Sequence, residues 1–161
     1  MRMDFVKKTL RVLMALMLLG FATDGGAQDK PADNMQIVRE KVRADKKLFV
    51  GANMELTESE AKAFWPVYEK YQDELFLLRS RTAKLINDYT EAYKDMSDEK
   101  ATALLNELIK IEALGAKVKQ AYLPKFQKVL PVKKVVRYYQ LENKIQMTLY
   151  YELARQIPLV Q

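Results

Sequence analysis

The 161-residue chain contains neither histidine nor cysteine. Their absence excludes catalytic triads that use histidine, cysteine nucleophiles, zinc sites built from cysteine and histidine, and haem bound through histidine. Its three serines lie in none of the patterns that activate a serine nucleophile, and its five glycines form no phosphate-binding loop. We therefore expect a protein that is not an enzyme and that has no cofactor and no metal site.

Long apolar runs are scarce as well, and the most pronounced block extends only from Val12 to Phe21. It follows a basic stretch and precedes the small residues Gly25 and Ala27, which is the order of a secretory signal peptide. Ten apolar residues are too few to span a bilayer, which needs about 20. We therefore expect export by the Sec route, cleavage near Ala27, and a periplasmic location for the mature protein.

Removal of residues 1–27 would take away four basic and two acidic residues, so the formal net charge would fall from +6 to +4. Residues 28–34 show no periodicity and are expected to be a flexible leader. Residues 35–161 are expected to form a single helical domain. Because a chain without cysteine gains no stability from disulfides, packing or oligomerisation has to stabilise it.

Boundary signals predict where the first two helices lie. We expect one helix over Met35–Val50, ending near Gly51–Asn53, because glycine and asparagine suit a C-terminal cap. The next helix begins at a capping box, in which the Thr57 hydroxyl accepts a hydrogen bond from the amide of Glu60 and the Glu60 carboxylate accepts one from the amide of Thr57.

Two further helices follow. Ser97, with two acids after it, is expected to be the N-cap of the third helix. Pro131 suits the first turn of the fourth, which should end before Pro158.

Apolar residues at alternating spacings of three and four predict that the second and third helices pack lengthwise as an antiparallel coiled-coil hairpin. The expected fold is all-α, an elongated four-helix arrangement built on this hairpin. Pro66 and Pro124 lie at similar distances from the turn of the hairpin, so the bends that they cause would coincide and give the hairpin a concave side. Alternatively, each proline marks a helix end. On the second helix these apolar positions are residues 61, 68, 75, 82 and 89 with 64, 71, 78, 85 and 92. On the third they are Ala101, Leu104, Leu108, Ile111, Gly115, Val118, Tyr122 and Val129, and on the fourth Val135, Tyr138, Leu141, Ile145, Leu149 and Leu153.

A weak internal repeat relates two segments, Leu56–Trp65 and Leu130–Tyr139, at an offset of 74 residues. Each copy has a leucine, a helix start and a pair of aromatic residues. Both copies would lie at the open end of the hairpin. This arrangement is expected to bring together Phe64, Trp65, Phe126, Tyr138 and Tyr139.

The charge distribution offers a candidate binding surface. Between Glu112 and Glu142 there is no carboxylate, whereas seven lysine and arginine residues occur there among aromatic ones. Such a surface attracts polyanions, acidic polypeptides or anionic lipid, although the same residues could simply form a solvated helix face. The candidate client-binding residues are Lys117, Lys119, Tyr122, Lys125, Phe126, Lys128, Lys133, Lys134 and Arg137.

The two copies of the repeat resemble the paired L-T-x-x-Q helix starts of the Spy/CpxP family of periplasmic stress proteins. The motif positions are Leu56, Thr57 and Glu60 in the first copy and Leu130, Pro131 and Lys134 in the second. The resemblance implies a four-helix cradle that dimerises and acts as an ATP-independent chaperone on a basic, partly apolar concave surface. Metal-sensing relatives use histidine ligands, which this chain does not have.

The function expected from these observations is ATP-independent, chaperone-like binding of unfolded or partly folded envelope proteins in the periplasm, by a homodimer. One alternative is a regulatory adaptor that binds the periplasmic domain of an envelope-stress sensor kinase. Another is a protein that binds anionic lipid or cell-wall polymer. Nucleic acid is not an expected partner, because the signal peptide directs the chain out of the cytoplasm.

Overall fold

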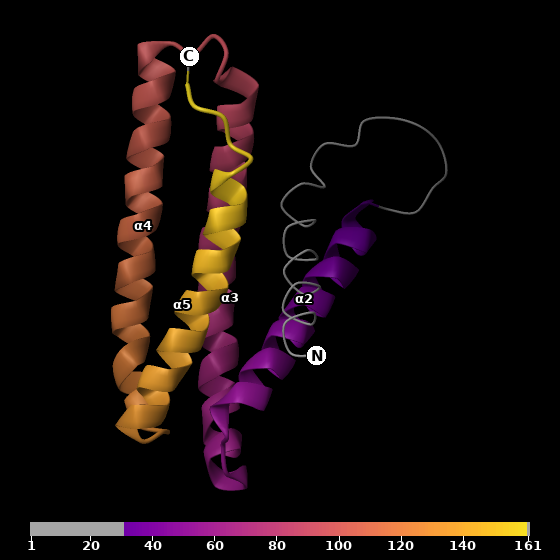
Figure 1. Cartoon of the computed structure of the whole chain (residues 1–161), viewed down its shortest axis with the longest axis vertical. Coiled ribbons are helices and arrows are strands. Elements are labelled where there is room, and N and C mark those ends of the chain that lie inside the picture. Colours follow the sequence, from indigo (N-terminus) through magenta and orange to yellow (C-terminus); the bar gives the residue numbers. More distant parts are fainter. Residues whose placement is uncertain (1–30, 161) are drawn as a thin grey trace. The chain divides into compact units, whose positions relative to one another are not determined.

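The computed structural model describes the backbone of residues 31–160 and the side chains of residues 40–160 (Figure 1). Over residues 31–160 it contains four helices and no strand, which confirms the expected all-α fold. The expected signal peptide, residues 1–27, lies outside the described part, as do residues 28–30 of the leader. The helices are α2 (Pro31–Met54), α3 (Glu58–Ala92), α4 (Asp98–Gln127) and α5 (Val132–Ala154).

The described residues divide into two compact units. One unit contains α2 and residues 138–154 of α5. The other contains residues 56–137, which include the whole of α3 and α4 and the first turns of α5, together with the segment that begins at Arg155. The candidate binding surface expected from the sequence belongs to this second unit.

Both ends of α2 differ from the expectation. The helix begins at Pro31, so residues 31–34 are helical rather than part of a flexible leader; a proline at the start of a helix sacrifices no hydrogen bond, because first-turn amides have no partner within the helix. At the other end α2 continues through Gly51 and Asn53 to Met54. The residue with the left-handed conformation is Glu55, with φ of 51°, so the expected cap at Gly51–Asn53 is wrong.

The capping box at the start of α3 is confirmed. The amide of Glu60 donates to Thr57 Oγ1 at 3.3 Å, and the amide of Thr57 donates to Glu60 Oε2 at 2.8 Å. Ser97 is likewise confirmed as the N-cap of α4, because its hydroxyl accepts from the amide of Lys100 at 3.2 Å. These short-range hydrogen bonds satisfy first-turn amides that the helix itself leaves without partners.

α3 and α4 pack against each other as an antiparallel hairpin (Figure 1). Aromatic rings fill its open end, where α3 begins and α4 ends: the ring centroids of Phe64 and Phe126 lie 5.7 Å apart, and those of Tyr71 and Tyr122 lie 5.1 Å apart. With the fully buried Tyr68, these four residues form what we call the aromatic cluster. Ring pairs at such distances stabilise a core beyond the area that they bury.

Aliphatic side chains fill the hairpin nearer its turn. Leu85 of α3 and Leu104 and Ile111 of α4 form a buried cluster, against which Tyr89 and Met96 pack. This cluster and the aromatic cluster confirm the expected seam along much of its length. Two seam positions were assigned wrongly: Leu108 is 41% exposed, and Val129 lies in the turn beyond α4.

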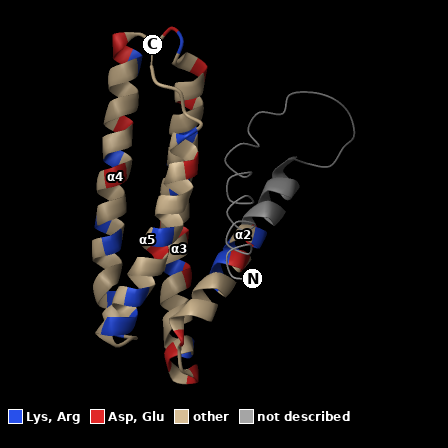
Figure 2. Cartoon of the chain, in the orientation of Figure 1, with Lys and Arg blue, Asp and Glu red and all other residues tan. Residues whose placement is uncertain are grey.

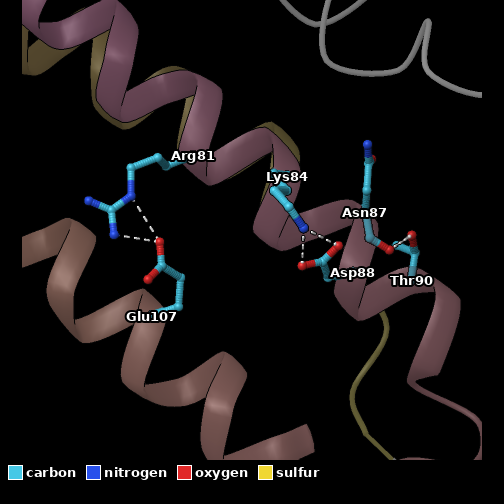
Figure 3. Close-up of polar contacts among 6 residues, drawn as sticks. All are labelled: Arg81, Lys84, Asn87, Asp88, Thr90 and Glu107. Atoms are coloured by element: carbon cyan, nitrogen blue, oxygen red, sulfur yellow. Dashed lines mark hydrogen bonds and ion pairs between the residues drawn. The ribbon is translucent and has the colours of Figure 1, made fainter.

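Polar contacts also join the two arms. Arg81 of α3 donates from both Nε and Nη2 to Glu107 Oε1 of α4, at 2.9 and 2.7 Å (Figure 3). One turn further along α3, the Lys84 ammonium pairs with the Asp88 carboxylate at 2.7 Å, an i,i+4 arrangement that supports the helix. Asp88 therefore has a lowered pKa, caused first by its hydrogen bond with Lys84.

Neither proline inside the hairpin marks a helix end. α3 continues through Pro66, and α4 continues through Pro124 to Gln127. The alternative that each proline terminates a helix is therefore wrong for Pro66, and Pro124 lies in the last turns of α4 rather than beyond it. The concave side inferred from the two prolines stays a prediction.

The unit that contains α2 has a buried ion pair. Lys46 Nζ lies 2.7 Å from Glu142 Oε2, and the two side chains are only 4% and 7% exposed. The other carboxylate oxygen of Glu142 accepts a hydrogen bond from the Tyr138 hydroxyl at 3.1 Å. The pair joins α2 to α5 across 96 positions of sequence. The neighbouring Tyr139 has its pKa raised to about 12, by burial first and by the charge of Glu142 second.

Candidate binding surface

The carboxylate-free stretch forms the last turns of α4, a short connection and the first turns of α5. Figure 2 shows blue segments gathered at this end of α4 and at the start of α5. Five of its cations are exposed to solvent. We call this surface, with two exposed valines described below, the basic corner; its cations are Lys117, Lys125, Lys128, Lys133 and Arg137.

Backbone hydrogen bonds fix the corner. The amides of Lys128 and Leu130 donate to Pro124 O and Phe126 O, which closes the end of α4. Pro131 O then accepts from the amides of Lys134 and Val135, which starts α5 immediately. Leu130 and Val135 are buried, at 4% and 2% exposed, and they anchor the connection, while Lys128 and Lys133 face solvent.

Lys134 is not an exposed cation of the corner. Its ammonium forms an ion pair with the Glu60 carboxylate of α3, and the two side chains are 27% and 17% exposed. This pair lowers the pKa of Glu60, first through the hydrogen bond from Lys134 and then through the bond from the amide of Thr57. Lys134 therefore fastens the first turn of α5 to the first turn of α3. Lys119, another candidate, is only partly exposed.

The structure corrects the placement of the two aromatic candidates. Tyr122 is 7% exposed and Phe126 is 0% exposed, because both rings belong to the aromatic cluster between α3 and α4. Burial is also the main cause that raises the pKa of Tyr122, with the charges of Glu74 and Asp73 as further causes. These rings have little or no surface to offer a client and stabilise the hairpin instead.

Tyr122 still influences the basic corner, because its ring contacts the ammonium group of Lys125. Lys125 Nζ lies 4.0 Å from the centroid of the Tyr122 ring, a distance at which the ring quadrupole attracts the ammonium. The contact holds the Lys125 ammonium over the edge of the core rather than leaving its long stem free to rotate. One cation of the basic corner is thus partly preorganised.

Two exposed apolar residues of the corner were missed from the sequence. Val132 is 62% exposed and Val136 is 51% exposed, and both lie among Lys133 and Arg137 in the first turns of α5. They are four residues apart, and therefore share a helix face that differs from the buried row of Val135. Their i,i+4 spacing could have identified this second face.

The aromatic residues that the repeat was expected to bring together fall into two groups. Phe64 lies 5.0 Å from Trp65 and 5.7 Å from Phe126, measured between ring centroids. Tyr138 and Tyr139 belong to the other unit, where their ring centroids are 5.7 Å apart. The grouping is confirmed for the three rings of the hairpin unit.

The motif positions behave as helix-start residues. Thr57 caps α3, and Pro131 directly precedes α5 and accepts its first hydrogen bonds. Leu130 is buried and Leu56 is partly buried. The fourth position of each copy, Glu60 and Lys134, forms the ion pair described above.

The described side chains contain no group of three acidic residues arranged to hold a metal ion. None of the helices in the described part of the chain is both long enough and apolar enough to cross a membrane. What the basic corner offers chemically is attraction by its exposed cations, together with two exposed aliphatic side chains.

Comparison of the chain with protein-family models, with curated proteins and with solved structures finds no match in any of the three.

Proposed function

We propose that the chain is an exported, non-enzymatic protein that binds unfolded or partly folded envelope proteins at the basic corner without using ATP. The observation that carries the proposal is the group of exposed cations around the α4–α5 connection, on a stretch of sequence that contains no carboxylate, together with the exposed Val132 and Val136. A surface that only kept the protein soluble would be expected to intersperse charges of both signs.

Charge would act at the capture step. Exposed cations attract acidic segments over roughly 10 Å at moderate ionic strength and raise the rate of encounter. They contribute less to the lifetime of the complex, because exposed ion pairs are worth only about 0 to 1 kcal/mol each. Capture is therefore fast and dependent on salt.

The two valines would act at the retention step. Burying their exposed surface against an apolar client segment contributes about 25 cal/mol per Å². Two small aliphatic side chains give a weak and nonspecific contact, from which a client can leave without an energy source. The buried rings of Tyr122 and Phe126 support the surface from beneath and do not hold the client.

The signal-like N-terminus supports a location outside the cytoplasm, and the resemblance of the two motif copies to the Spy/CpxP family supports a chaperone role there. The ion pair of Glu60 with Lys134, which joins the two copies of the motif, shows that the motif residues stabilise the contact between two helix starts. A regulatory adaptor would use the same surface for one sensor protein instead of many clients.

An aggregation assay tests the proposal. The protein without residues 1–27 is added in equimolar amount to a denatured acidic client as the client is diluted into buffer of low salt. The expected result is delayed light scattering, and the delay should shorten as salt is added. Unchanged scattering with every acidic or neutral client tried would reject the chaperone role.

A further inference from the structure

The segment that follows α5, residues 155–160, lies at the closed end of the hairpin, and we call it the strap. It belongs to the same compact unit as α3 and α4. Figure 1 shows its trace running toward the turn between these two helices. The Tyr89 hydroxyl, in the last turn of α3, donates a hydrogen bond to Pro158 O at 2.6 Å. The two residues are 69 positions apart, so this contact is a tertiary one.

The surface that the strap contacts is aromatic. We call it the hairpin tip, and its residues are Tyr89, Tyr93 and Met96. Tyr89 and Met96 pack against the buried aliphatic cluster between α3 and α4. The rings of Tyr89 and Tyr93 stack, with centroids 6.3 Å apart and planes 23° from parallel. The core therefore fixes the tip, which offers a ligand both apolar contact and a hydroxyl donor.

The strap has a backbone that such a surface can recognise. α5 ends at Ala154, and residues 158–160 form neither helix nor strand. Pro158 fixes its own φ and disfavours helical geometry at Ile157, so the chain leaves the helical path there. Extended proline-containing peptides lose little conformational entropy on binding, and aromatic surfaces commonly recognise them. The hydrogen bond from Tyr89 to Pro158 resembles this recognition, within one chain.

The strap buries little of its own apolar surface. Leu159 is 87% exposed and Val160 is 55% exposed, while Ile157 is partly buried. The hydrogen bond between Tyr89 and Pro158 is itself exposed to solvent. Segments with few buried apolar contacts and exposed hydrogen bonds open at a low cost in free energy. A competing segment can therefore reach the hairpin tip whenever the strap opens.

We propose that the hairpin tip is a binding site for an extended, proline-containing apolar segment of another protein, and that the strap occupies the site until such a segment displaces it. The strap identifies the ligand class, because it is the segment that lies on the tip. This site goes beyond the basic corner and does not depend on it. It lies at the opposite end of the hairpin, and it binds through rings and a hydroxyl instead of cations.

A labelled peptide with the sequence of residues 155–160, blocked at both ends, tests the site by fluorescence anisotropy. It is titrated against the protein without residues 1–27 and against the same protein with Ile157→Asp, whose buried charge should detach the strap. The variant should bind at least about 10-fold more tightly, because an occupied site lowers the apparent affinity. A chain that ends at Ala154, and so has no strap, should match it. If neither altered chain binds more tightly than the wild type, the proposal is overturned.

The role of the Tyr89 hydroxyl is tested in the Ile157→Asp protein. Tyr89→Phe should weaken peptide binding about 2- to 10-fold, the range expected for one lost hydrogen bond between neutral groups. Tyr93→Phe is the matched control, because it removes a hydroxyl of the tip that is not the donor to Pro158, and it should leave binding unchanged. A peptide with alanine in place of proline should also bind more weakly. If neither Tyr89→Phe nor the alanine peptide changes the affinity, the peptide does not bind at the hairpin tip as proposed.

Discussion

Glu60 and Lys134 occupy the same position in the two copies of the internal repeat, and their side chains form an ion pair. They are 74 residues apart, which is the offset of the repeat itself. The two helix starts are therefore fastened to each other through equivalent positions of opposite charge. The repeat thus marks a contact at the open end of the hairpin.

The Thr57 cap should stabilise the protein measurably. Thr57→Ala removes the acceptor for the amide of Glu60, and loss of an N-cap costs about 1 kcal/mol. Urea denaturation followed by circular dichroism should show this decrease with unchanged helical content. Ser80→Ala is the control, because the exposed Ser80 hydroxyl donates to Phe76 O inside α3 and takes no part in the cap; an equal loss in both variants would contradict the role of Thr57.

The Glu60–Lys134 pair should make stability depend on pH. Lys134 and the amide of Thr57 lower the pKa of Glu60 below its ordinary value of 4.5. A carboxyl with a lowered pKa contributes stability that is fully present above the ordinary pKa and is lost as the pH falls through the folded-state pKa.

Glu60→Gln isolates that contribution, because glutamine can keep the capping box while losing the charge. The variant should unfold at lower urea than the wild type near neutral pH, and the two midpoints should converge as the pH falls below 4.5. Glu58→Gln, which alters a carboxylate in the same turn but outside the pair, is the control. A Glu60→Gln difference that is constant with pH would show that the ion pair does not cause it.

The aromatic cluster should matter for stability rather than for client release. Phe126→Ala leaves a cavity at a fully buried site and should cost about 3 to 5 kcal/mol. Val136→Ala, at an exposed site, should change the free energy of unfolding by less than about 0.5 kcal/mol and should speed client release. Denaturation and stopped-flow dissociation, measured on both variants, separate the two roles. If Phe126→Ala sped client release without loss of stability, the Phe126 ring would belong to the binding surface instead.

The buried pair of Lys46 and Glu142 should be costly to break on one side only. Lys46→Met leaves a buried carboxylate without its cation and should destabilise by about 3 to 5 kcal/mol, whereas Lys46→Met with Glu142→Leu should recover much of that loss. Lys41→Met, which removes a largely exposed partner of Asp45, should cost about 1 kcal/mol or less. If Lys46→Met and the double variant lost the same free energy of unfolding, the cost would not come from an unpaired buried carboxylate.

The sequence predicted local features better than tertiary ones. Thr57 and Ser97 were identified as caps because a cap involves residues only three positions apart. The cap of α2 was misplaced, because the glycine and asparagine near its end suggested a cap, whereas the helix continues to Met54 and the residue with positive φ is Glu55.

Burial on α4 could not be assigned from spacing alone. The helix carries two apolar rows, and periodicity does not say which row faces α3; Leu108 was assigned to the seam and lies outside it. From the sequence, Tyr122 and Phe126 each had two expected roles: Tyr122 was expected in the seam and Phe126 among the grouped aromatic residues, and both were also expected on the binding surface. The structure confirms the first role, because their rings pack on Tyr71 and Phe64 of α3, and not the second.

The pairing of Lys46 with Glu142 needed tertiary contact to be recognised. Lys46 lies between Val42 and Val50 at spacings of four, which places a cation within a buried row. That spacing is the signal in the sequence, but the position of its partner 96 residues later is fixed only when α2 and α5 meet.

The rate of client capture is the most direct test of the central proposal. Lys125, Lys128 and Lys133 lie in the basic corner, while Lys94, Lys100 and Lys110 are also exposed but lie outside it. Replacing either trio with glutamine changes the net charge by the same amount. Stopped-flow association with a fluorescent acidic client, at several salt concentrations, should show that the first trio slows capture and weakens its dependence on salt while the second leaves both nearly unchanged. Equal effects of the two trios would mean that net charge, and not the basic corner, attracts the client, and would contradict the proposed binding surface.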